Sequence, residues 1–262
     1  MDLELRGKTA LVTGASYGLG YACAKVLASE GVMVAINSSN AKKIEAAARE
    51  IASNQGAKVS AIAADLKSEE ELQSLAQQAM KQLGKIDILV VSTGHPATFP
   101  FSKASDENWK DGIDLLLRPP IVLTRAVLEG MKSRKFGRII FIGSIFGLEP
   151  ERTSVVQSTL RTGLNALAKC VASEVAGDGV TVNVICPGYF DTPLVRSLAQ
   201  KYAHEKNLSV ESVLEEWAEY APVKRFGKPD DLGALVAFLC SPKSEFITGT
   251  AITIDGGAIR QY

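Results

Sequence analysis

Short runs of apolar and β-branched residues alternate along the chain with longer stretches that have the pattern of amphipathic helices. Several of the short runs are apolar on both faces, as a parallel sheet covered by helices requires. Strand alternating with helix predicts a doubly wound α/β sheet with right-handed crossovers. We expect seven strands, most of them parallel, at residues 8–13, 32–37, 58–64, 87–92, 137–143, 179–185 and 250–254.

Two of the amphipathic stretches carry signals for helix ends. Ser39 and Asn40 are plausible N-caps for a helix that follows them. Ser68 and Glu71 have the spacing of a capping box, and Gly84 is placed to end that second helix.

The chain shows no repeat, no low-complexity segment and no linker, so we expect one domain over residues 1–262. Residues 193–228 interrupt the alternation late in the chain and are mostly helical in pattern. We predict that they form a lid over the carboxyl ends of the strands, where sheets of this kind bind ligands.

A glycine-rich loop lies between the first predicted strand and the helix after it. Gly14, Gly18 and Gly20 are spaced GxxxGxG in the segment VTGASYGLGYA. Glycines permit a tight turn and let backbone N–H groups approach a pyrophosphate at a helix N-terminus. With a strand before it and a helix after it, the loop predicts nucleotide binding, although a turn that merely needs room has the same pattern.

Composition adds few constraints. Lys plus Arg equals Asp plus Glu at 29 each, which gives no reason to expect nucleic acid or an anionic membrane as partner. The N-terminus lacks the apolar core of a secretory signal, and no apolar run approaches the ~18 residues of a spanning helix, so we expect a cytoplasmic protein. The four cysteines form no CxxC pair, and we expect buried free thiols and no metal site.

Several motifs together resemble the short-chain dehydrogenase/reductase family over nearly the whole chain. They are the glycine loop TGxxxGxG, Asp65 in AADLKS, the segment CPGYFDTP at 186–193, and the C-terminal stretch at 225–257. Within the family the chain is most similar to 3-oxoacyl-acyl-carrier-protein reductases and sugar dehydrogenases. The resemblance implies a Rossmann-type fold, and a nicotinamide cofactor held by Gly14, Ser16, Tyr17, Gly18, Leu19, Gly20, Asp65, Leu66, Gly94, Pro187, Gly188, Phe190 and Thr192.

The end of the second strand bears on which nicotinamide cofactor is used. NAD-binding proteins usually place an acid here to accept from the ribose 2′-OH, but this chain has Asn37, Ser38 and Ser39. No acid is present to repel a 2′-phosphate, so we favour NADP, with NAD as the alternative. Lys42 or Lys43 could reach the phosphate, but both are expected to face solvent.

The catalytic positions depart from the family pattern. The resemblance implies a tetrad of Ser, Tyr, Lys and Asn, in which tyrosine protonates the carbonyl oxygen and lysine holds the ribose. Ser144 matches the serine, but Gln157, Arg161 and Leu116 stand at the other positions. A carboxamide has no useful acidity near pH 7, and arginine stays protonated. Gln157 and Arg161 can stabilise an oxyanion and Arg161 can hold ribose hydroxyls, so they offer electrostatic stabilisation without a general acid.

Another residue could supply the proton. His95 follows the fourth predicted strand and is the best candidate, since histidine titrates near neutral pH, but it also fits a solvent-facing loop residue. Tyr189 is a weaker candidate, and Tyr17 fits a residue that packs on the cofactor. The usual NNAG segment of the family reads VSTG here, at 91–94.

Pro119 and Pro120 lie where the resemblance places a helix that is distorted near its asparagine. Our hypothesis is that the prolines keep this bend, and the alternative is simply two helices.

These observations leave three functional hypotheses open. The first is a divergent oxidoreductase that uses NADP(H) on a carbonyl, alcohol or acyl-thioester substrate. The second is a nucleotide-binding pseudoenzyme that senses cofactor or serves as a partner subunit, and the third is non-redox chemistry in the same pocket. The resemblance further implies a homotetramer or homodimer joined through the helices that contain residues 106–134 and 154–177.

Overall fold

The computed structural model describes residues 1–260, with the backbone alone at Gln55. One sheet has the order β3-β2-β1-β4-β5-β6-β7, and every neighbouring pair is parallel. All seven predicted strands are confirmed, and the sheet is wholly rather than mostly parallel. The strands are β1 (Thr9–Val12), β2 (Met33–Ser38), β3 (Val59–Ala63), β4 (Ile88–Val91), β5 (Gly137–Ile142), β6 (Val180–Pro187) and β7 (Ala251–Ile254).

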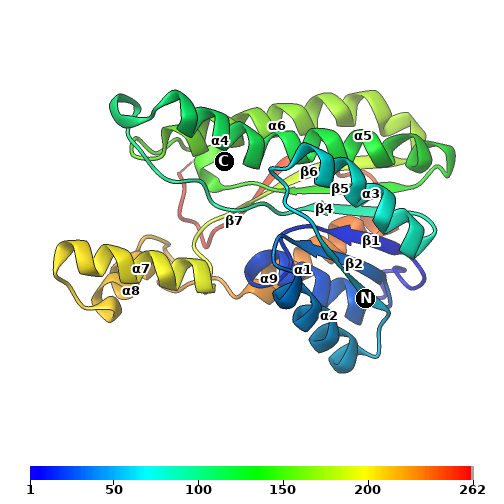
Figure 1. Ribbon diagram of the computed structural model, residues 1–262, viewed down its shortest axis with the longest axis horizontal. Coiled ribbons are helices and arrows are strands. Elements are labelled where there is room, and N and C mark those ends of the chain that lie inside the picture. The colour runs from blue at the N-terminus through cyan, green and yellow to red at the C-terminus, as the bar shows by residue number, and fades with distance from the viewer. Residues whose placement is uncertain (261–262) are drawn as a thin grey trace.

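Helices cover both faces of the sheet and make three layers (Figure 1). One face carries α1 (Gly18–Ser29), α2 (Ala41–Gln55) and α9 (Pro229–Cys240). The other carries α3 (Glu69–Leu83), α5 (Arg118–Ser133) and α6 (Val155–Val175), with α4 (Asp106–Leu116) packed on α6. Each face has its own apolar core because the buried strands are apolar on both sides.

The strand order reverses beside β1, which pairs with β2 on one side and β4 on the other. The crossovers therefore diverge at this point, and a crevice opens between them at the carboxyl ends of the strands. The order places the glycine loop after β1, VSTG after β4 and Ser144 after β5 along one edge of the sheet.

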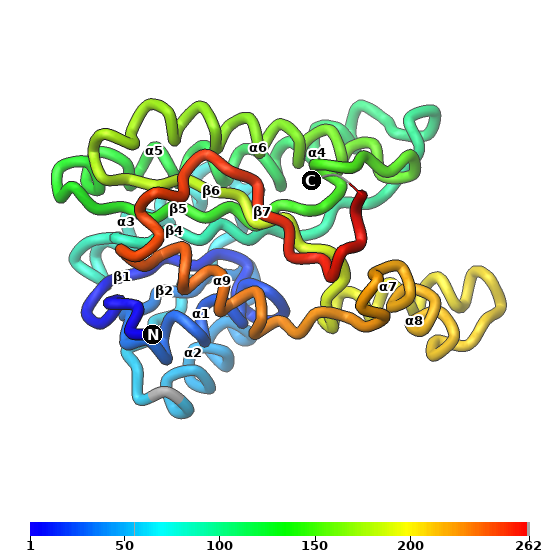
Figure 2. The backbone as a smooth tube through the Cα atoms, turned by 180° about the vertical axis from the view of Figure 1, so that it is seen from behind, coloured from blue at the N-terminus to red at the C-terminus, as the bar shows by residue number. Residues whose placement is uncertain are grey.

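Residues 193–228 contain α7 (Pro193–Lys206) and α8 (Val210–Glu219), which project as an arm from one end of the molecule (Figures 1 and 2). The two helices pack on each other through a small apolar cluster that includes Ala199, Ala203 and Val213. The ring of Trp217 stacks on Tyr189, with 5.9 Å between centroids, and so joins the arm to the segment after β6. The predicted helical content is confirmed, while closure of the arm as a lid stays a prediction.

The expected helix caps are confirmed only in part. Asn40, rather than Ser39, caps α2, because its side chain accepts from the N–H of Lys43 at 3.0 Å. Ser68 caps α3, but the Glu71 carboxylate accepts from the N–H of Asp65 at 2.8 Å rather than from Ser68. The capping box is therefore half formed, and its acid instead fixes the turn that carries Asp65.

The two prolines lie in the first turn of α5, where a missing N–H removes no helical hydrogen bond. The helical run is interrupted at Leu117, between α4 and α5. An unbroken helix through this region would have contradicted the proline hypothesis. The observed break agrees with that hypothesis, and it agrees equally with the alternative of two separate helices. Leu116 is fully buried against Val156 and Leu160, so the family's asparagine position is part of a small apolar core.

Cys23, Cys186 and Cys240 are buried free thiols as predicted, but the prediction is wrong for Cys170, which lies on the outer surface of α6. Within residues 1–260 no helix has the length and apolarity needed to cross a membrane.

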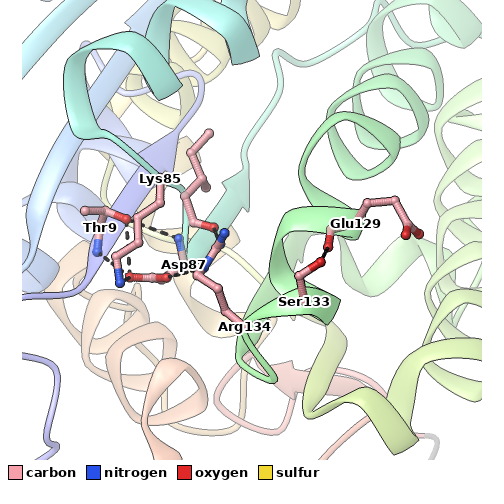
Figure 3. Close-up of polar contacts among 7 residues, drawn as sticks. Thr9, Lys85, Asp87, Glu129, Ser133 and Arg134 are labelled. Carbon is pink, nitrogen blue, oxygen red and sulfur yellow. Dashed lines mark hydrogen bonds and ion pairs between the residues drawn. The ribbon is translucent and has the colours of Figure 1, made fainter.

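A cluster of polar side chains closes the opposite, amino-terminal edge of the sheet (Figure 3). Asp87, which precedes β4, is 1% exposed and accepts from the backbone N–H of Thr9 at 3.3 Å. Lys85 Nζ lies 2.9 Å from one of its carboxylate oxygens and Arg134 Nε lies 3.3 Å from the other. Asp87 thus ties β1 and β4 to the end of α5, far along the strands from the crevice.

Candidate active site

A cleft of about 600 Å³ occupies the crevice at the carboxyl ends of the strands. Every site residue predicted from the sequence borders it, and the structure therefore brings together segments from seven parts of the chain. They are Gly14, Ser16, Tyr17, Gly18, Leu19, Gly20, Ser38, Ser39, Asp65, Leu66, Gly94, His95, Ser144, Gln157, Arg161, Pro187, Gly188, Phe190 and Thr192.

The glycine loop brings the start of α1 to the floor of the cleft. Gly14 has φ +57°, and a Cβ there would lie 2.6 Å from the carbonyl oxygen of Ser92. A Cβ at Gly20 would overlap the carbonyl oxygen of Gly14, so the helix packs directly on the turn. No side chain caps α1 and its first turn has no acid. Its first N–H groups and the positive end of its dipole are therefore available to an anion.

The end of β2 forms the far end of the cleft. Ser38 and Ser39 line it together with Lys43 on the first turn of α2. We expected Lys43 to face solvent, and it is exposed, but it also borders the cleft beside the ring of Tyr17, at 5.9 Å from the centroid. Asp65 is the one acidic residue among the described lining residues, and its Oδ1 accepts from the N–H of Lys67 at 2.9 Å.

Ser144, Gln157 and Arg161 all border the cleft. Ser144 follows β5, and its hydroxyl accepts from the N–H of Phe146 at 3.2 Å. Gln157 and Arg161 share one face of α6 and are 4% and 7% exposed. The Oε1 atom of Gln157 and the Nε atom of Arg161 are buried without a hydrogen-bond partner among the described residues. Buried polar atoms in folded proteins are rarely left in this state, and among the described residues only those on Asn37, Ser60, Thr124 and Thr181 share it.

Gly147 brings α6 close to the end of β5. A Cβ at Gly147 would lie 2.9 Å from the backbone of Arg161, so only glycine permits this approach. The carbonyl of Gly147 accepts from Thr162 Oγ1 and from Asn165 Nδ2, both at 3.0 Å. These contacts hold Arg161 where its Nη1 donates to the carbonyl oxygen of Ile142.

Burial dominates the electrostatics of this centre. Removal from water lowers the pKa of Arg161 to about 10, which still leaves the guanidinium charged at pH 7. The buried thiol of Cys186 lies close enough to feel this charge, but burial raises its pKa to about 11 and it stays neutral. No acid in the described chain forms an ion pair with Arg161, so the centre carries a net positive charge.

His95 is half-buried on the wall of the cleft rather than free in solvent. Its pKa is lowered, first by burial and then by the positive charge of Arg161. The imidazole is therefore neutral at pH 7. A neutral imidazole is a poor general acid, so the placement favours His95 as a site residue while its charge state weakens it as the proton donor.

The segment after β6 forms the remaining wall. Thr192 caps α7 by accepting from the N–H of Val195 at 3.3 Å, and its hydroxyl proton remains available to a ligand. A Cβ at Gly188 would lie 2.8 Å from Asp255, which explains the glycine at this position. Tyr189 is packed against Trp217 and Tyr220, and burial raises its pKa, which makes it a poorer proton donor.

Sequence reasoning missed part of the lining. Some of these residues follow a strand whose end was already assigned to the site, so the alternation of strand and helix could have located them. Others come from the arm and from α4, and no sequence signal places them there. The missed residues are Asn40, Ala64, Leu115, Ile142, Gly143, Ile145, Phe146, Leu194, Val195 and Leu198.

The residues present fit a nicotinamide dinucleotide. The uncapped start of α1 and the packed glycine loop suit a pyrophosphate, and the cleft continues to hydroxyls at both ends. The fold and this cleft together define an α/β dinucleotide-binding protein of the Rossmann type.

Comparisons with known proteins agree with this class. The model of a family described as Enoyl-(Acyl carrier protein) reductase matches residues 14–258. The 3-oxoacyl-acyl-carrier-protein reductase of Aquifex aeolicus is 32% identical over 257 residues, with 98% of this chain and 99% of that protein covered. The D-beta-hydroxybutyrate dehydrogenase of Cupriavidus necator is 35% identical over 259 residues, with 98% and 100% covered.

Among solved structures, L-sorbose reductase from Gluconobacter frateurii, complexed with NADPH and L-sorbose, superimposes with a TM-score of 0.96 at 30% identity. The match covers 100% of both chains. The chain belongs to the short-chain dehydrogenase/reductase family of oxidoreductases.

Proposed function

We propose that this protein is an NADP(H)-dependent oxidoreductase that interconverts a carbonyl compound and its alcohol in the cleft at the carboxyl edge of the sheet. The observation that carries the proposal is the uncapped, acid-free start of α1 beneath a cleft of about 600 Å³. The NADPH-bound reductase with the same fold supports the cofactor. We expect residues 193–228 to act as the lid of this domain and the protein to work in the cytoplasm.

The glycine loop and the first turn of α1 would hold the pyrophosphate, with Ser16, Tyr17 and Leu19 contributing from the loop. Asp65 and Leu66 would contact the adenine, and Gly94 would lie beside the cofactor. Pro187, Gly188, Phe190 and Thr192 would hold the nicotinamide end. When bound, the cofactor supplies or accepts the hydride.

Lys43 is the residue best placed to select NADP over NAD. It borders the cleft next to Ser38 and Ser39, and no acid stands at the end of β2. A charge-assisted hydrogen bond to the 2′-phosphate would favour NADP. Lys43→Glu is expected to weaken NADPH binding by about tenfold or more, with NADH binding kept. Lys42→Glu makes the same charge change one residue away, outside the cleft, and should change the NADPH affinity little.

At the reacting centre the chain supplies electrostatic stabilisation. Ser144 and the amide of Gln157 can donate hydrogen bonds to the substrate oxygen, and Arg161 can stabilise the negative charge that develops there. None of the three gives up a proton near pH 7. Of the residues that border the cleft, His95 comes closest to serving as a general acid. Water that enters the cleft is the other source of a proton. Turnover should therefore lack much of the ~10²–10⁴-fold contribution of a general acid.

The lack of a general acid at the reacting centre favours a second candidate function. A cleft that keeps its cofactor-binding features but holds Gln157, Arg161 and Leu116 at the tetrad positions suits a protein that binds NADP and reports its redox state to a partner. In this case binding is retained and turnover is absent.

The test compares the native protein with the double variant Gln157→Tyr/Arg161→Lys. NADPH and NADH binding are measured by fluorescence, and oxidation of each is followed against ketones, sugars and 3-oxoacyl thioesters. Turnover by the native protein supports the oxidoreductase, and His95→Gln should then reduce the rate. Turnover by the double variant alone supports the binding protein. Failure of both proteins to bind either cofactor would contradict both functions.

The protein is expected to assemble into a homodimer or homotetramer through α4, α5 and α6. Ile113 on α4 and Ile121 on α5 are exposed apolar residues on these helices. Light scattering should give a mass two or four times that of the 27.9 kDa chain, and a monomer would contradict this expectation.

A further inference from the structure

Arg161 is a buried cation with few partners. Its side chain is 7% exposed, and its one hydrogen bond runs from Nη1 to the carbonyl oxygen of Ile142. Nε is buried without a partner. Nη2 makes no hydrogen bond to the described residues. Unlike Nε, it is not completely buried, so part of its surface is open to the cleft that Arg161 borders.

Arg138 shows how this fold satisfies a buried arginine when no ligand is involved. It is 2% exposed, and its guanidinium donates to the carbonyl oxygens of Gly137, Gly179 and Ser241 at 2.9 to 3.4 Å. The ring of Phe136 covers one face of it at 4.4 Å. Three acceptors and an aromatic face replace the water that Arg138 loses, whereas Arg161 has one acceptor.

Within residues 1–260, no group around Arg161 supplies a negative charge. Asn165, Gln157 and Ser144 are neutral, and Cys186 and His95 are neutral at pH 7 for the reasons given above. An isolated buried cation is costly unless an anion or several acceptors compensate it. The hydroxyls of a nicotinamide ribose are neutral, and the cofactor phosphates belong at the glycine loop after β1, not at α6 behind β5.

Nε and Nη2 form the edge of the planar guanidinium that arginines commonly present to a carboxylate. In this structure Nε is enclosed by the protein, so a carboxylate in the cleft would contact Arg161 through Nη2. The same edge of Arg196 holds Asp191 in this protein, with Nε and Nη2 at 2.8 and 2.9 Å from its two carboxylate oxygens.

We propose that Arg161 is a carboxylate-binding residue and that the substrate is a small oxo acid or hydroxy acid rather than a neutral ketone or thioester. This inference rests on the proposed function in placing the substrate carbonyl at Ser144, but it assigns Arg161 to the acid group. Nη2 is the donor at the cleft surface and makes the first contact. The carboxylate supplies the negative charge that the described residues do not place at Arg161.

The test uses pyruvate, 3-oxobutanoate and 4-oxopentanoate, each beside its methyl ester, which differs by the loss of charge. Binding is measured by calorimetry at pH 7, with and without NADP⁺, which cannot reduce an oxo acid. At least one acid should bind about tenfold or more tightly than its ester, as expected for hydrogen bonds to a charged group. Equal binding of every acid and its ester, or no binding of any acid, would overturn the proposal.

Three variants assign the preference to Arg161. Arg161→Gln should abolish it, and Arg161→Lys should keep part of it because the charge remains without the fork. Arg152→Gln removes an exposed arginine that does not border the cleft, and the preference should persist. A preference that survives in Arg161→Gln would assign the acid to another residue and overturn the proposal.

Gln157→Glu gives a second test that does not depend on losing the arginine. Gln157 lies one helical turn before Arg161 on the same face, so a glutamate there would supply an internal carboxylate. The thermal midpoint should rise and the preference for acids should disappear. A native-like preference in this folded variant would contradict the proposal.

Binding of NADP⁺ alone separates this inference from the proposed function. If NADP⁺ binds and no acid is preferred, the oxidoreductase stands and the carboxylate site fails. If an acid is preferred and NADP⁺ does not bind, the carboxylate site stands and the proposed function fails.

Discussion

Two groups of buried polar side chains lie at opposite edges of the same sheet, and they are satisfied to very different degrees. At the amino edge, Asp87 is held by Thr9, Lys85 and Arg134 (Figure 3), and Arg138 is held by three carbonyl oxygens. At the carboxyl edge, Gln157 and Arg161 each keep a buried polar atom without a partner. The first edge uses its polar groups to join strands and helices.

The second edge differs, because the two side chains with an orphaned atom there border a cleft. Folded chains leave few buried polar atoms unpaired, and among the described residues Asn37, Gln157 and Arg161 have theirs on side chains that border the cleft, while Ser60, Thr124 and Thr181 do not. The comparison therefore distinguishes structural from functional polar burial, and it predicts opposite responses to substitution at the two edges.

The largest effect is expected at Asp87. Asp87→Ala removes the acceptor of the Thr9 N–H and the partner of two cations, and should lower the free energy of unfolding by about 3 kcal/mol. Urea unfolding followed by circular dichroism measures this. Asp111→Ala, which breaks an exposed ion pair with Lys67, is the control and should change stability far less. Equal effects of the two substitutions would contradict a structural role for Asp87.

The two buried arginines give the next test. Arg138→Met removes three hydrogen bonds to carbonyl oxygens, whereas Arg161→Met removes one hydrogen bond together with an uncompensated charge. Arg138→Met should cost about 2 kcal/mol more stability than Arg161→Met in the same unfolding experiment. If Arg161→Met is the more destabilising of the pair, Arg161 belongs to the structural class.

A smaller effect of opposite sign is expected at Gln157. Gln157→Met keeps the length of the side chain and removes a buried oxygen that has no partner. The ligand-free protein should become more stable by about 1 kcal/mol, measured by urea unfolding. Ser158→Ala, one residue along, removes a hydroxyl that is hydrogen-bonded to the N–H of Glu151 and should instead destabilise. Destabilisation by both substitutions would remove the distinction between the two edges.

The smallest effect concerns the titration of His95, which shares the chain with one other histidine, His204. Burial and then the charge of Arg161 lower its pKa. In Arg161→Gln the His95 pKa should move upward, because one of the two causes of its lowering is removed. Two-dimensional NMR from pH 4.5 to 8 follows both rings. An unchanged His95 titration in this variant would mean that Arg161 does not act on it.

The sign for stability follows from the same shift. The unfolded chain protonates His95 near pH 6.5, as ordinary histidines do, and the folded protein does so at lower pH. The contribution of His95 to stability is therefore complete above the pKa of the unfolded chain. It is lost as the pH falls through the lower pKa of the folded protein. Arg161→Gln should reduce this loss.

The sequence alone determined the architecture of this protein and the location of its cleft. Apolar runs such as 137–143 and 179–185 are buried on both faces and tolerate no other placement than central parallel strands. Gly14, Gly18 and Gly20 located one end of the cleft, and Ser144, Gln157 and Arg161 were found by matching the chain to the catalytic positions that the family resemblance implies. These features are local, or repeat along the chain with a fixed period, and so can be read from the order of residues.

Only the tertiary structure decided which buried polar groups are satisfied. In sequence Asp87 and Gln157 look alike, because each lies in or beside an apolar segment. In the structure Asp87 contacts cations from α5 and from the start of β4, whereas Gln157 contacts none among the described residues. The partners of Arg138 come from residues 137, 179 and 241, and the closeness of Gly147 to Arg161 depends on the packing of α6 on β5. Hydrogen bonding and charge compensation are set by which segments meet in space, and that is fixed only when the sheet and its helices pack together.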